Sequence, residues 1–141
     1  MIQRIQTIWL LLITICAFAT YSLPIYIGHL QNGTSKNFLI PDNFLLFPLI
    51  FGLGALALVC IFLFKNRKLQ FRLCIIGILI SIATIILEYT KAADFKQVNN
   101  FQSGSYQLGA LIPFLIVILF ILAARGIYKD EKLVKSLDRL R

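Results

Sequence analysis

The chain has 141 residues, of which 59% are hydrophobic and 14% are charged, and its mean hydropathy is +0.84. Soluble domains are roughly 45–50% apolar and about 25% charged, and monomers of this size do not leave so much apolar surface in water. The composition therefore excludes a soluble enzyme, a disordered tail and a fibre, and it indicates a protein of the lipid bilayer. In a membrane protein, the first explanation for a net charge of +8 is the orientation of the chain, because cytoplasmic loops are rich in Lys and Arg.

A helix crosses a hydrocarbon core of about 30 Å with roughly 20 residues. Four apolar runs meet or approach this length: residues 8–27, 44–64, 72–89 and 108–124. The first run continues beyond Ala19, so we expect an uncleaved span rather than a signal peptide. The third is short and needs the side chains of Arg72 and Glu88 to reach the interfaces. We predict an all-α fold, an integral membrane four-helix bundle of two transmembrane hairpins over residues 1–124.

The basic residues gather on one side of this arrangement. Four spans put both termini on the same side, and that side carries eleven of the fourteen Lys and Arg residues. The two opposite loops hold the other three, Lys36, Lys91 and Lys96. Because cytoplasmic loops of membrane proteins are enriched in Lys and Arg, we predict that both termini are cytoplasmic.

Residues 125–141 form a second predicted unit, a basic cytoplasmic tail. We expect them to continue the fourth span as an amphipathic helix, with Gly126 as the place where a break would fall. Leu133, Leu137 and Leu140 fall on one stripe of this helix, away from the charged residues. Two interpretations stay open: a helix on anionic lipid headgroups, or a docking element for a protein, ribosome or nucleic acid partner.

The tail and the loop between the second and third spans share the cytoplasmic face, and together they supply the candidate partner-binding residues. These are Lys65, Arg67, Lys68, Arg72, Lys129, Asp130, Glu131, Arg139 and Arg141. Arginine makes bidentate contacts that lysine cannot reproduce, so we expect Arg139 and Arg141 to contact a partner specifically.

Polar groups at depth in a membrane usually mark function, and the predicted spans offer almost none. Glu88 is the one carboxylate adjoining an apolar run, beside Tyr89 at its outer end. It is read either as a solvated helix-end carboxylate that pairs with Lys91 or Lys96, or as an intramembrane polar site. His29 stands alone in an outer loop, so no histidine-based site can be assembled.

The three cysteines lie within or beside apolar runs, and we interpret them as small buried hydrophobes rather than disulfides or metal ligands. We therefore predict no catalytic, cofactor or metal site and a non-enzymatic protein. Small residues recur on neighbouring turns of two spans, in the segment from Gly52 to Ala57 and in Gly77-x-x-x-Ser81. They indicate close helix contact, either within the bundle or between subunits.

Three charged segments resemble one known family. They are the opening Met1-Ile2-Gln3-Arg4-Ile5-Gln6-Thr7, the loop from Lys65 to Cys74, and the ending from Lys129 to Arg141. All three resemble the domain-of-unknown-function 4293 family, small inner-membrane proteins of Bacteroidota-type bacteria, over essentially the whole chain. The resemblance implies a multi-pass protein of the bacterial inner membrane with both termini cytoplasmic, and it supplies no activity.

Two classes of function remain open from the sequence. In the first, the chain is an accessory or scaffold subunit of a membrane complex, which docks a cytoplasmic or membrane partner through the basic loop and tail. In the second, it is a small transporter or channel component with a site between helices near Glu88. The scarcity of deep polar groups favours the first class.

Overall fold

The structure is a computed structural model that describes residues 2–30, 34–64, 66–99, 101 and 103–138. The described residues form four α-helices: α1 (Ile2–Ala19), α2 (Leu46–Phe62), α3 (Arg67–Asn99) and α4 (Ile112–Asp138). They also form three strands: β1 (Tyr26–His29), β2 (Ser35–Phe38) and β3 (Ser103–Tyr106). Short 3-10 turns at Ile40–Asp42 and Leu108–Leu111 precede α2 and α4.

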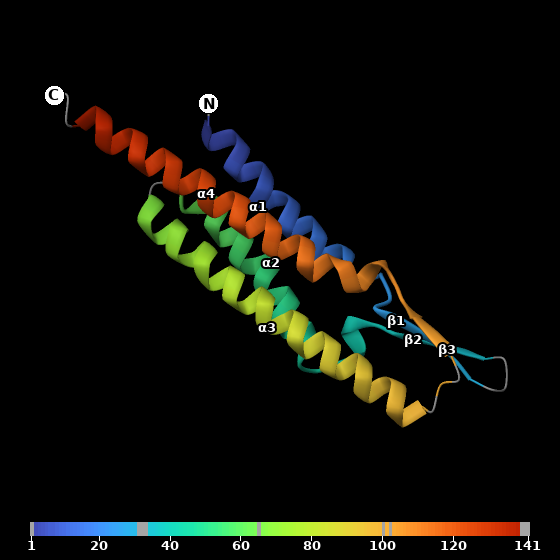
Figure 1. The fold of residues 1–141 in the computed structure, drawn as a ribbon. Helices are drawn as coiled ribbons and strands as arrows, with labels where there is room; N and C mark the ends of the chain where they lie inside the picture. Colours follow the sequence, from blue (N-terminus) through green and yellow to red (C-terminus); the bar gives the residue numbers. More distant parts are fainter. Residues whose placement is uncertain (1, 31–33, 65, 100, 102, 139–141) are drawn as a thin grey trace.

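The four helices form an antiparallel bundle (Figure 1). Helix α1 packs against α2 and α4, and α3 packs against the same two helices on the other side. Helix α1 begins and α4 ends at one end of the bundle, here called the terminal end, and the strands lie at the opposite end, the sheet end (Figure 1). The predicted helical fold with four main helices is confirmed.

The small sheet at the sheet end was not predicted from the sequence. Its order is β2-β1-β3 with antiparallel neighbours, and Tyr26 of β1 pairs with Phe38 of β2 and Tyr106 of β3. The sheet therefore joins the connection between α1 and α2 to the connection between α3 and α4. Strands of four residues are too short for a period-2 pattern to stand out, and β3 pairs with a strand far away in the sequence.

The sheet also changes the end of the first helix. The first span was predicted over residues 8–27, and its C-terminal part is not helical. Helix α1 ends at Ala19, and Tyr26 begins β1. Thr20 closes the helix, since its hydroxyl donates to the Ala17 carbonyl at 2.6 Å. Pro24 then keeps the chain extended, because proline has no N–H to continue a helix.

Helix α4 runs without interruption through the boundary predicted after residue 124. The break expected at Gly126 is absent from this fully helical stretch, and the glycine instead allows a close helix approach. A Cβ atom at Gly126 would lie 2.9 Å from Cγ of Gln6 on α1. The first part of the predicted tail is therefore packed against the bundle.

Large apolar side chains face outward from the bundle, whereas small and polar ones face inward on α3. The buried residues of this helix are Gln70, Cys74, Gly77, Ser81, Thr84, Glu88 and Ala92. The Ser81 and Thr84 hydroxyls donate to carbonyls of their own helix, at 2.9 and 2.8 Å. On the outside, Leu79 and Ile86 are 62% and 61% exposed. Small interior residues and an apolar exterior are typical of helices packed in lipid.

Two helical segments, Arg67–Asn99 and Leu108–Val134, are long and apolar enough to cross a membrane by length and composition. Ile5–Ala19 and Leu46–Phe62 are apolar but shorter.

Two of the small residues noted in the sequence make the expected close contacts within the bundle. A Cβ atom at Gly77 on α3 would lie 2.7 Å from the Phe120 ring of α4. A Cβ atom at Gly54 on α2 would lie 3.1 Å from Cβ of Ala17 on α1. At Gly52 no described atom lies within 4 Å. Packing inside the bundle therefore accounts for Gly54 and Gly77.

Candidate functional site

A network of polar side chains ties the helices together at the terminal end. The Asp130 carboxylate of α4 is buried, 5% exposed, and accepts a hydrogen bond from Nε2 of Gln6 on α1 at 2.5 Å. Nη1 of Arg67, at the start of α3, donates to the backbone carbonyl of Asp130 at 3.2 Å. Asp130 was expected to meet a partner, but its side chain faces the interior of the bundle and joins α1 to α4.

A second buried amide holds α3 against α2 at the same end. Nε2 of Gln70 donates to the carbonyl of Cys60, one of the last residues of α2, at 3.0 Å. The rings of Phe71 and Tyr128 meet at 6.1 Å between α3 and α4. These contacts determine where the first turn of α3 lies relative to α4.

The charged residues beyond these contacts form a groove, here called the basic groove. It has a volume of about 700 Å³ and is lined by Asn66, Arg67, Lys68, Leu69, Arg72, Glu131 and Val134. Four of the predicted partner-binding residues, one carboxylate and three cations, therefore come together from α3 and α4. Leu69 and Val134, both exposed, give the groove an apolar part.

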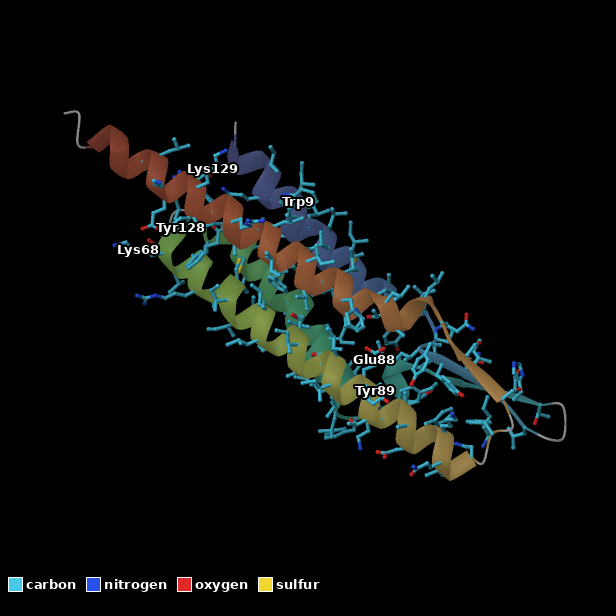
Figure 2. All side chains as sticks on the ribbon, viewed as in Figure 1. Trp9, Lys68, Glu88, Tyr89, Tyr128 and Lys129 are labelled. Carbon is cyan, nitrogen blue, oxygen red and sulfur yellow. The ribbon has the colours of Figure 1, made fainter. Side chains whose placement is uncertain are left out.

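The other predicted partner-binding residues lie elsewhere. Lys129 is exposed on α4 but does not line the groove, and Figure 2 shows it with Lys68 and Tyr128 toward the terminal end. Lys65, Arg139 and Arg141 lie outside the described residues.

Glu88 differs from the solvated carboxylate that was one of its two readings. It is 5% exposed on the inward stripe of α3, in the part nearest the sheet (Figure 2). No hydrogen bond or ion pair connects its carboxyl group to another described residue. The expected pairing with Lys91 is wrong, because Nζ of Lys91 contacts Oδ2 of Asp94 at 3.4 Å. The reason is that α3 continues ten residues beyond Tyr89, to Asn99, so Glu88 is an interior position of the helix.

A pocket of about 470 Å³ opens beside Glu88, between the sheet-end halves of α3 and α4. It is lined by Ile85, Ile86, Glu88, Tyr89, Tyr106, Ala110, Leu111 and Phe114. The pKa of the Tyr106 phenol is raised, first by partial burial and then by the nearby Tyr89, Tyr26 and Glu88 groups. Glu88 is the acidic residue of an otherwise apolar and aromatic lining.

An aromatic cluster lies between this pocket and the end of the bundle. Rings of Phe38, Phe95 and Phe101 follow one another at centroid distances of 5.0 and 5.3 Å, and Tyr26 contacts Tyr106 at 5.2 Å. Phe95 belongs to α3, so the cluster packs the sheet against this helix. Sequence periodicity could not predict this cluster, because Phe95 lies on α3 whereas the other members lie on short strands or in the connection between α3 and β3.

One family matches the sequence, over residues 2–140, and its description is Domain of unknown function (DUF4293). The chain belongs to this family. The resemblance seen in the three charged segments is thereby confirmed. No curated protein and no solved structure matches the chain.

Both candidate sites of this DUF4293 chain, the basic groove and the Glu88 pocket, fall inside the matched residues. Within the described part of the chain, no group of three His, Cys, Asp or Glu side chains is arranged to hold a metal ion. Cys60 and Cys74 are buried free thiols in contact across α2 and α3, and Cys16 is a half-buried free thiol.

Proposed function

We propose that this DUF4293 protein is a non-enzymatic, multi-pass protein of the bacterial inner membrane that docks a partner protein at its basic groove. The membrane location is supported by the composition and by the apolar side chains on the outside of the helices. Both termini and the groove would face the cytoplasm, because that side carries eleven of the fourteen Lys and Arg residues.

The helix lengths fit this placement. Helix α3 has 33 residues and spans about 50 Å, which exceeds a hydrocarbon core of about 30 Å. Its last turns, with the Lys91–Asp94 ion pair, and the small sheet would then lie beyond the outer surface of the bilayer. Helices α1 and α2, with 18 and 17 residues, would span about 26 Å with little tilt.

The observation that carries the docking function is the meeting of two distant charged segments in one groove. Arg67, Lys68 and Arg72 come from the start of α3, and Glu131 and Val134 come from α4. The arginines suit bidentate binding of carboxylates, and Leu69 and Val134 offer apolar contact. A protein segment with acidic and apolar side chains matches both properties, whereas a bare lipid headgroup uses only the charge.

The test is co-purification of the full-length chain from its native membranes in mild detergent. The variant Lys68→Glu with Arg72→Glu should lose a stoichiometric partner that the parent retains. The matched control is Arg125→Glu with Lys132→Glu, which makes the same charge change on exposed residues outside the groove. Equal loss in both variants would mean general attraction to anionic lipid, and no loss in the groove variant would contradict docking there.

The alternative function is a small transporter or channel component, and one observation favours it. Glu88 is a buried residue whose carboxyl group has no hydrogen-bond or ion-pair partner among the described residues, and such groups mark ion and substrate pathways in membranes. Purification as a discrete protein with no stoichiometric partner, together with solute uptake into proteoliposomes, would favour this class over docking.

A further inference from the structure

We infer that the Glu88 pocket is a binding site for a lipophilic organic cation, an ammonium or phosphonium group that carries apolar substituents. This goes beyond the docking function, because the pocket lies at the sheet end of the bundle, away from the basic groove.

The first argument is charge. Glu88 is 95% buried and lines the pocket, and its carboxyl group has no hydrogen-bond or ion-pair partner among the described residues. The nearest described lysine in sequence, Lys91, is already paired with Asp94. Among the described residues no fully buried side-chain oxygen lacks a hydrogen-bond partner, so the Glu88 oxygens reach the pocket. A carboxylate in such apolar surroundings is costly, and a cation bound in the pocket would compensate its charge.

The second argument is the chemistry of the lining. Tyr89, Tyr106 and Phe114 supply aromatic rings, which attract organic cations through their faces. Ile86 and Leu111 supply aliphatic surface for the substituents. A metal ion is a poor match, because Ca²⁺ and Mg²⁺ need several oxygen ligands and this lining has a single carboxylate.

The third argument is size and access. A volume of about 470 Å³ is within the range of roughly 300–1,000 Å³ typical of small-molecule sites. The rim residues Ile86 and Leu111 are 61% and 63% exposed on the outside of the bundle. If the chain is membrane-embedded as proposed, this opening faces lipid, so a lipophilic ligand reaches the site from the bilayer. Binding itself does not depend on that location and is measured in detergent.

The experiment is equilibrium dialysis of tetraphenylphosphonium against the full-length chain in detergent. The parent should bind about one cation per chain in a saturable manner. Glu88→Gln, which keeps the shape and removes the charge, should weaken binding tenfold or more. Asp42→Asn is the matched control, because Asp42 is exposed in the turn before α2 and its loss should change affinity less than twofold. Tetraphenylborate, an anion of the same shape that is dialysed by itself, should bind at least tenfold more weakly than the cation.

A second variant tests the pocket while leaving the carboxyl group intact. Ala110→Leu should fill the space and weaken binding tenfold, whereas Ala55→Leu, on an exposed position of α2, should not. Size-exclusion chromatography checks that each variant folds. If Glu88→Gln does not fold, the Ala110→Leu variant decides the test. Parent-like affinity in either folded variant, or equal affinity of the parent for tetraphenylborate dialysed by itself, would overturn the inference. Partner co-purification at the basic groove is unaffected by either result.

Discussion

The contact between Gly77 and Phe120 makes the packing of α3 on α4 testable by one added methyl group. In Gly77→Ala the new Cβ atom would lie 2.7 Å from Cε1 and Cζ of the Phe120 ring. The ring cannot swing outward, because Phe120 is 0% exposed and surrounded by core residues. Overpacking of this kind costs about 1–3 kcal/mol.

The helix itself provides an opposing effect and a matched control. Replacing glycine by alanine inside a helix stabilises it by about 0.5–1 kcal/mol. Gly52→Ala on α2 gains this effect with no clash, since no described atom lies within 4 Å of its Cβ position. The difference in unfolding free energy between Gly52→Ala and Gly77→Ala therefore isolates the clash, at about 1–3 kcal/mol.

The assay is reversible unfolding in detergent, followed by circular dichroism, for both variants in the parent and in a Phe120→Ala background. Removing the ring alone should cost about 3–5 kcal/mol. In that background the penalty of Gly77→Ala should disappear, because the methyl group then enters the cavity. The reasoning is refuted if Gly77→Ala is as stable as Gly52→Ala, or if its penalty persists without the ring.

Three further predictions concern the terminal end and the topology. Asp130→Ala leaves the buried Nε2 of Gln6 without its acceptor, so unfolding free energy in detergent should fall by about 1–3 kcal/mol, and an unchanged value would contradict the network. Reporter fusions after the C-terminal residue and within residues 32–37 should report opposite compartments; a C-terminus outside would disprove the proposed orientation. Arg139→Lys with Arg141→Lys, which keeps the charge, should lose partner binding as deletion of residues 139–141 does; if only the deletion loses it, electrostatic anchoring replaces specific recognition.

The apolar runs determined the number of main helices and their order. A long apolar segment can pair all of its own backbone N–H and C=O groups only as a helix. The connection between the second and third runs is short, which favours α2 and α3 as antiparallel neighbours, as the bundle shows. The excess of Lys and Arg in the tail and in the loop between the second and third runs likewise indicated that these distant segments share one face. Arg67, Lys68, Arg72 and Glu131 do so in the basic groove.

What the tertiary structure decided are the features that depend on which face a side chain occupies. The sequence indicated a partner-facing charge at Asp130 and left Glu88 as either a solvated carboxylate or an intramembrane polar site. Both are buried because α3 and α4 continue past the apolar runs. The sheet arose in the same way, from pairing between Tyr26 and Tyr106 across most of the chain. Local pattern contains no information on such non-local contacts. The sequence therefore determined the helices and the distribution of charge, and only their packing placed one carboxylate against Gln6 and the other in a pocket.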